Sequence, residues 1–234
     1  MTGEIRGLAL ETSGRVGSVA LSADGVTRAC EQFPHGLAHA ARIIPVMDSL
    51  CRARNWKPND IHEIYVSIGP GSFTGLRVGI TVAKTMATAT GARLIAVPSV
   101  RVLAENAPPE AKHVVIVLDA KRGQIFTARF ERDENGWTER ESAHLDTLAE
   151  MIARSPRPLH LLGEGLPYHL QPPHEGVFLT GESMWQARAE NVARLGWHMA
   201  RSGHFVKPLE LLPLYVRPPE AEEKFHSRAG GENP

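Results

Sequence analysis

Residues 68–80 read Ile68-Gly69-Pro70-Gly71-Ser72-Phe73-Thr74-Gly75-Leu76-Arg77-Val78-Gly79-Ile80. This glycine-rich stretch separates an apolar segment from a long helical run. Proline fixes φ and glycine permits positive φ, so Gly69-Pro70-Gly71 predicts a sharp turn between a strand and a helix. Backbone N–H groups at the start of that helix, those of Ser72, Phe73 and Thr74, would suit an anion or a partner's carboxylate. The alternative is a purely structural turn.

The composition indicates a compact protein without a strong charge bias. The 234 residues suit one large domain or two small ones. The chain has 26 Lys and Arg against 26 Asp and Glu, which argues against a stand-alone nucleic-acid binder. The two cysteines, Cys30 and Cys51, predict neither a disulfide framework nor a zinc knuckle. No apolar run approaches the roughly 20 residues that span a bilayer, and no signal-peptide pattern opens the sequence, so we expect a cytoplasmic protein.

Apolar periodicity on both sides of the glycine-rich stretch predicts alternating strands and helices. Strands interleaved with helices indicate an α/β fold. The expected strands lie within 7–22, 63–68, 93–97, 113–118, 124–130 and 159–163, and the expected helices lie over 36–54, 74–90, 98–106, 145–154 and 184–202.

The second half of the chain repeats the opening of the first half. One apolar strand ends in Glu11 and a later one ends in Asp119, and each acid is followed by a polar turn and an alternating strand. This is the organisation of duplicated actin-like, ribonuclease-H-like folds, in which paired hairpins face each other across a cleft. We therefore expect two subdomains, over 1–106 and 107–217, and a flexible tail over 218–234.

Four motifs together resemble the TsaB (YeaZ) family in order and in spacing. They are Gly7-Leu8-Ala9-Leu10-Glu11-Thr12-Ser13, the stretch from Gly69 to Gly79, Leu118-Asp119-Ala120-Lys121-Arg122-Gly123-Gln124 and Pro213-Leu214-Tyr215-Val216-Arg217. The resemblance extends to about Arg217, although residues 138–184 add little to it. It implies a duplicated actin-like (ASKHA) α/β fold with two subdomains.

The resemblance also implies a function. A chain of this family is expected to be a non-catalytic subunit in the bacterial synthesis of tRNA threonylcarbamoyladenosine, the modified adenosine beside the anticodon. It would bind and activate the TsaD transferase as a heterodimer, and the isolated protein would form a homodimer through the same surface. TsaE and ATP or ADP are expected at the assembled complex, which would also reach the tRNA, and no cofactor is expected for this chain alone.

Two helices carry the expected partner interface. Small residues recur every four positions from Gly75 to Gly91, and such a ridge lets another helix approach closely. The helix over 36–54 is apolar on more than one side, which favours two neighbours, a sheet and a second chain. The expected interface residues are Leu37, Ile44, Met47, Gly75, Leu76, Arg77, Gly79, Ile80 and Ala83. The alternative is that the ridge packs on the chain's own sheet.

Two enzymatic alternatives remain open at this stage. A metallopeptidase-like site would need His35 and His39, which share a helix face, but they precede the glycine-rich stretch whereas the metal pair of TsaD follows it. A stand-alone ATPase or sugar-kinase relative would carry an acid-x-Gly-x-Thr phosphate loop, which Glu11-Thr12-Ser13-Gly14 departs from. Glu11 and Asp119 would either point into the cleft or anchor their hairpins. We therefore expect neither a catalytic residue nor a metal ligand.

Overall fold

A computed structural model describes residues 3–34, 38–169 and 172–216. Its first half builds a five-stranded sheet in the order β3-β2-β1-β4-β5. β1 is antiparallel to β2 and parallel to β4, which is the pattern of a hairpin followed by helical crossovers. The strands are β1 (Arg6–Glu11), β2 (Gly17–Ala23), β3 (Val26–Phe33), β4 (Glu63–Ser67) and β5 (Arg93–Val97).

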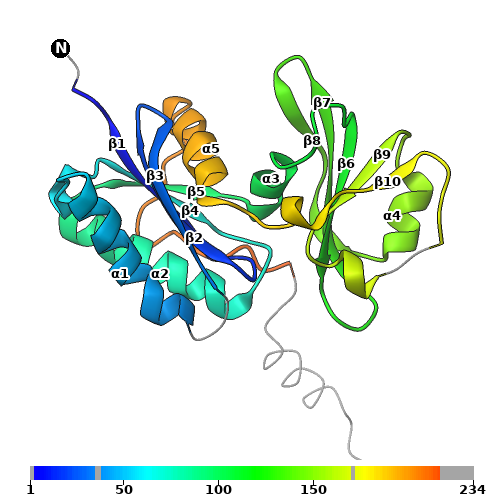
Figure 1. The fold of residues 1–234 in the computed structure, drawn as a ribbon, viewed down its shortest axis with the longest axis horizontal. Helices are drawn as coiled ribbons and strands as arrows, with labels where there is room; N and C mark the ends of the chain where they lie inside the picture. The colour runs from blue at the N-terminus through cyan, green and yellow to red at the C-terminus, as the bar shows by residue number, and fades with distance from the viewer. Residues whose placement is uncertain (1–2, 35–37, 170–171, 217–234) are drawn as a thin grey trace, which may run out of the picture.

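The second half builds another five-stranded sheet with the same topology. Its order is β8-β7-β6-β9-β10, in which β6 is antiparallel to β7 and parallel to β9. Two copies of this arrangement in one chain confirm the expected duplicated actin-like, ribonuclease-H-like α/β fold with two subdomains (Figure 1). The strands are β6 (His113–Asp119), β7 (Ile125–Asp133), β8 (Gly136–Asp146), β9 (Leu159–Leu162) and β10 (Val177–Leu179).

Helices cover both faces of the first sheet. α1 (Ala38–Ala53) and α2 (Phe73–Thr90) lie side by side on one face, and α5 (Ala189–Arg201) lies on the opposite face (Figure 1). Successive strand residues point to opposite faces, so Leu8 and Leu10 pack beneath α1 and α2 whereas Ala9 joins the core beneath α5. Both faces of the central strand are therefore buried, as its continuous apolar sequence predicts.

The second sheet is covered by shorter helices. α4 (Leu148–Arg154) packs against Val115 and Val117, and α3 (Ser99–Ala104) packs on the other face, between the two sheets (Figure 1). The core around α3 continues into the core beneath α5, so the two subdomains share one apolar cluster. Short 3-10 turns complete the fold at η1 (Pro58–Asp60), η2 (Leu166–Tyr168) and η3 (Glu182–Met184). Across the part of the chain described, no helix combines the length and apolar character needed to cross a membrane.

The segment after residue 188 returns to the first subdomain. The backbone N–H of Ala189 donates to Ser18 Oγ at 2.9 Å, Val206 N donates to Leu94 O at 2.9 Å, and Leu211 is buried in the core beneath α1 and α2. The sequence-based boundary placed these residues in the second subdomain. They pack on the first sheet because that sheet has a second apolar face to cover, and Gly196 leaves room there for the ring of Tyr65.

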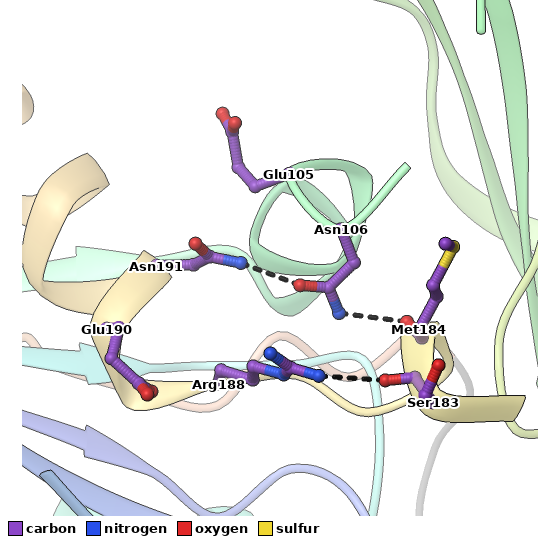
Figure 2. A pocket seen from close by; sticks show the side chains of 7 residues that line it. All are labelled: Glu105, Asn106, Ser183, Met184, Arg188, Glu190 and Asn191. Atoms are coloured by element: carbon purple, nitrogen blue, oxygen red, sulfur yellow. Dashed lines mark hydrogen bonds between the residues drawn. The ribbon is translucent and has the colours of Figure 1, made fainter. Parts of the chain in front are cut away.

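Asn106 lies in the segment that leads from the first subdomain to the second, and it hydrogen-bonds to the segment that returns. Its Nδ2 donates to Met184 O at 2.9 Å and to Gln186 O at 2.6 Å, and its Oδ1 accepts from Asn191 Nδ2 at 2.8 Å. Figure 2 shows this amide pair beside a polar pocket of about 400 Å³. The outgoing and returning segments are thus hydrogen-bonded to each other.

Candidate functional site

Glu11, the acid that ends β1, is fully buried and is held by the chain itself. Ser13 N and Ser13 Oγ both donate to Glu11 Oε1 at 2.6 Å, and Ser67 Oγ donates to Oε2. Burial raises the pKa of Glu11, and the hydrogen bonds from Ser13 and Ser67 offset only part of that effect. Both carboxylate oxygens therefore serve as anchors for the hairpin turn and for the end of β4.

The glycine-rich loop packs directly on this hairpin. Ser72 N donates to Ser13 O at 2.7 Å, and a Cβ on Gly71 would clash with the same carbonyl oxygen. Ser72 also caps α2, because its Oγ accepts from Gly75 N at 3.2 Å. The Ser72 N–H, which the sequence suggested for an anion, is thus already engaged within the chain.

The small residues of α2 face the same hairpin. A Cβ on Gly75 would clash with Thr12 O, and one on Gly79 would clash with Thr12 Oγ1. Ala83 and Ala87 continue this buried side of the helix. The ridge of small residues therefore packs on the chain's own sheet, which was the alternative to a foreign helix. Its glycines leave room for the hairpin that begins with β1.

Burial separates the expected interface residues into two groups. Gly75, Gly79 and Ala83 of α2 are buried. Leu76 and Ile80 of the same helix are 1% and 4% exposed, and Met47 of α1 is also buried. Ile44 is 51% exposed on α1, and Arg77 is exposed on α2. Leu37 lies outside the described residues. The surface that α1 and α2 leave free is thus their outward side, and not the ridge.

A polar cleft of about 300 Å³ lies between the two hairpins. Its lining residues are Gly14, Arg15, Gly71, Ser72, Leu118, Asp119, Lys121, Phe126 and Glu164. Of the two hairpin acids, Asp119 lines this cleft, whereas Glu11 is buried behind it. The cleft occupies the position between paired hairpins that the duplication predicts.

Asp119 is engaged by neighbouring groups. Lys121 Nζ donates to Oδ2 at 2.6 Å, Lys121 N donates to Oδ1 at 3.0 Å, and His169 Nε2 lies 3.1 Å from Oδ1. Burial opposes the charged form of Asp119, but these hydrogen bonds outweigh it and hold its pKa below the usual value. Asp119 is thus a carboxylate that anchors the β6–β7 turn.

Arg15 crosses the cleft from the first subdomain to the second. Its backbone N–H donates to Glu164 Oε2 at 3.1 Å, and its guanidinium donates to Tyr168 Oη. Its Cζ also lies 5.1 Å from the centroid of the Tyr168 ring. Sequence reasoning missed Arg15 and Tyr168 because 153 residues separate them and neither stands in a periodic pattern.

The remaining titratable candidates offer little reactive chemistry. Within residues 3–34, 38–169 and 172–216, no three His, Cys, Asp or Glu side chains converge as a metal site requires. His35 and the side chain of His39 fall outside what the structure describes. Burial raises the pKa of Cys30 to about 12 and also raises that of Cys51, so neither half-buried thiol is poised as a nucleophile.

The outward side of α2 carries an aromatic and cationic cluster. The Arg77 guanidinium lies 3.8 Å from the centroid of the Phe73 ring, and Arg77 Nε donates to Tyr215 Oη at 3.2 Å. Phe73 and Tyr215 stack with centroids 5.3 Å apart, and each ring is more than a third exposed. Tyr215 belongs to the family motif at 213–217, which was the sequence signal for this contact. Apolar periodicity alone assigned Tyr215 no role.

Comparison with known proteins agrees with this architecture. The family model for TsaD, described as tRNA N6-adenosine threonylcarbamoyltransferase, matches residues 36–183. The tRNA threonylcarbamoyladenosine biosynthesis protein TsaB of Bacillus subtilis is 30% identical over 195 residues, which are 80% of this chain and 83% of that protein. TsaB of Escherichia coli is 29% identical over 223 residues, covering 91% of this chain and 95% of that protein.

Solved structures match over nearly the whole length. YeaZ from Pseudomonas aeruginosa has a TM-score of 0.78 at 25% identity and covers 90% of this chain and 99% of that one. An uncharacterized protein with similarity to peptidase YEAZ, from the same organism, has a TM-score of 0.81 at 24% identity over 91% of this chain and 100% of that one.

Fold and site together define a duplicated actin-like protein whose two hairpin acids are engaged within the chain. The chain belongs to the family that the TsaD model describes and, within it, to the TsaB (YeaZ) proteins.

Proposed function

We propose that this chain is a non-catalytic subunit of tRNA threonylcarbamoyladenosine synthesis. It binds a TsaD-type transferase through the outward side of α1 and α2 and holds that transferase in its productive conformation. Transfer to tRNA takes place on the partner. ATP or ADP and TsaE join at the assembled complex, and tRNA reaches the chain through that complex.

The exposure of Ile44 carries this proposal. Ile44 is 51% exposed in the middle of α1, while Ile43, Val46 and Met47 of the same helix are buried. A helix with apolar residues on two sides needs a second neighbour.

The neighbouring helix α2 extends this apolar surface. Val78, Val82 and Met86 are half-buried along it, and polar Thr81 and Thr85 are exposed beside them. An apolar centre with a polar rim is the usual anatomy of a protein interface.

The cleft supports a non-catalytic role for this chain. An actin-like ATPase uses the acid of its first hairpin to hold a metal-bound water beside the phosphates. Glu11 is turned instead toward Ser13 and Ser67 and is 0% exposed. The N–H of Ser72 is one of the backbone donors at the start of α2 that would suit a phosphate, and its hydrogen bond to Ser13 O already occupies it. These contacts favour a scaffold over a stand-alone kinase.

Ile44→Asp tests the proposed surface directly. The substitution places a carboxylate at the centre of the interface without touching the core, so we expect a folded protein that no longer assembles with a purified TsaD-type transferase. Analytical ultracentrifugation measures assembly, and threonylcarbamoyl transfer to tRNA measures activation. Val26→Asp is the matched control, because Val26 is 55% exposed on β3. Assembly of Ile44→Asp at wild-type strength would contradict the proposal.

A further inference from the structure

The two subdomains are joined in different ways at two separate places. At the joint, they share the apolar cluster around α3, and Asn106 ties the outgoing segment to the returning one. At the cleft, two exposed polar side chains make the contact, those of Arg15 and Tyr168. Parting a buried apolar cluster exposes it to water at a cost, whereas exposed polar groups exchange their contact for water. The cleft is therefore the place where the subdomains can separate.

Arg15 stands on a hairpin turn that is held within the first subdomain. Ser13 N donates to Glu11 Oε1 at 2.6 Å, and Ser13 O accepts from Ser72 N at 2.7 Å. Arg15 follows Ser13 by two residues, and β2 begins two residues later at Gly17. The backbone that carries Arg15 is thus fixed to the first sheet and to the start of α2.

Tyr168 ends η2, which is held within the second subdomain. Gly165 N donates to Val117 O at 2.9 Å, and a Cβ on Gly165 would lie 2.7 Å from the amide nitrogen of Asp119. His169, the residue after Tyr168, has its Nε2 3.1 Å from Asp119 Oδ1. The turn that carries Tyr168 is thus fixed to the end of β6.

The contact between Arg15 and Tyr168 crosses the cleft. The Arg15 guanidinium donates to Tyr168 Oη, and its Cζ lies 5.1 Å from the centroid of the Tyr168 ring. Beside it, the backbone N–H of Arg15 donates to Glu164 Oε2 at 3.1 Å. Hydrogen bonds and cation–π contacts between exposed groups are weak, because water competes for the same partners. The contact can therefore break and re-form while each subdomain stays intact.

We propose that Arg15 and Tyr168 form a latch, which holds the cleft closed while the subdomains open and close about the joint at Asn106. The structure is that of the latched form. Opening moves Gly14 and Arg15 away from Glu164 and Tyr168, and so gives access to the lining of the cleft. Contacts that exist only in the closed form set the balance between the two forms. The inference concerns this chain alone and does not rest on the proposed function.

The backbone N–H of Arg15 reports opening directly, because its acceptor lies on the other subdomain. Amide hydrogen exchange, followed by nuclear magnetic resonance, measures how often that hydrogen bond opens. We expect Tyr168→Ala to speed exchange at Arg15 about tenfold. The N–H of Ser72 is bonded within the first subdomain, so it should keep its wild-type rate and also shows that the variant is folded.

Two further variants serve as controls. Tyr168→Phe keeps the ring and removes the hydroxyl, so we expect a smaller rise in exchange at Arg15. Phe178→Ala removes a ring of similar exposure, 51% against 53% for Tyr168, from β10 of the same subdomain. Because Phe178 does not line the cleft, we expect this variant to exchange like wild type.

Relaxation dispersion shows how much of the chain moves. Opening of the cleft changes the surroundings of residues on both of its sides, such as Gly71 and Leu118, at one common rate. We expect Tyr168→Ala to show this dispersion at both residues. Dispersion confined to residues 14–16 would overturn the latch, since only the hairpin turn would then be moving.

The exchange rates give the remaining outcomes. Equal rates at Arg15 in wild type and Tyr168→Ala would overturn the latch, and so would an equal rise in Tyr168→Ala and Phe178→Ala. If Tyr168→Ala also speeds exchange at Ser72, it has lost its fold, and Tyr168→Phe decides instead. A rise at Arg15 without one at Ser72 then supports the latch, and unchanged exchange at Arg15 overturns it.

Discussion

The amide nitrogen of Ser72 lies 2.7 Å from the carbonyl oxygen of Ser13 and joins the glycine-rich loop to the first hairpin. Gly71, Gly75 and Gly79 meet the same hairpin, each at a distance that excludes a Cβ atom. The loop motif therefore has a structural cause. It allows the N-terminal half of α2 to lie on the backbone of residues 12 and 13.

Alanine at Gly75 or Gly79 should destabilise the protein. Alanine normally favours a helix over glycine by about 1 kcal/mol, but here the added Cβ overpacks a filled site at a cost of roughly 1–3 kcal/mol. Thermal unfolding followed by circular dichroism measures the change. Thr85→Ala, at an exposed position of α2, is the control and should not lower the midpoint, because alanine favours a helix more than threonine does.

Thr12→Ala distinguishes the two glycines. Gly79 faces the Thr12 hydroxyl, whereas Gly75 faces the Thr12 carbonyl oxygen. Removing the side chain should therefore rescue Gly79→Ala and leave Gly75→Ala destabilised. Among the residues that the structure describes, the hydroxyl has no hydrogen-bond partner, so Thr12→Ala alone should cost little. Equal rescue of both variants would contradict the assigned contacts.

Glu11→Gln should change how stability depends on pH. Burial raises the pKa of Glu11 above its ordinary value of 4.5. A raised folded-state pKa gives stability that is present below the unfolded-state pKa and is lost as pH rises through the folded-state pKa. Glutamine has no proton to lose, so the stability of the variant relative to wild type should increase with pH above 4.5. Urea unfolding across that range measures it, and a constant difference would refute the assignment.

His160 should make the second subdomain sensitive to acid. Burial lowers its pKa below the ordinary 6.5, and its Nδ1 is buried with no partner in the described part of the chain. A lowered folded-state pKa gives stability that is present above the unfolded-state pKa and lost as pH falls through the folded-state pKa. His160→Phe, which can keep the stacking on Phe178, should therefore lose less stability than wild type below pH 6.5. Urea midpoints compare the two, and exposed His204→Phe should follow wild type.

Asn106→Leu should loosen the joint between the subdomains. The substitution removes the donor to Met184 O and the acceptor for Asn191, both drawn in Figure 2, and also the donor to Gln186 O. These groups are partly buried, so leaving them unpaired should cost less than the about 1–3 kcal/mol of a fully buried group. We expect a lower unfolding midpoint and faster proteolysis between residues 180 and 189. Asn135→Ala, at an exposed turn, is the control, and equal proteolysis of both variants would argue against the joint.

Much of the fold was predictable from the chain alone. The α2 helix over Phe73–Thr90, β4 and β5 lie close to the expected ranges because strong apolar periodicity and the glycine-proline turn mark them. The two acid-ended strands, at Glu11 and Asp119, indicated the duplication because each subdomain opens with the same hairpin. The candidate site was less predictable, since its contacts join residues far apart in sequence.

Local sequence thus determined most of the elements, their order and the family motifs, because these depend on neighbours within a few residues. The strands β3, β8 and β10 were not among the expected ones. Only the tertiary structure decided what each surface meets. Small residues at every fourth position of α2 showed that something approaches closely, but the parallel pairing of β1 with β4 is what brings Thr12 there. A helix near α5 was likewise expected, but only the structure shows that it packs on the free face of the first sheet. Burial depends on the whole fold, so the outward side of α1 and α2 emerged only from the assembled chain.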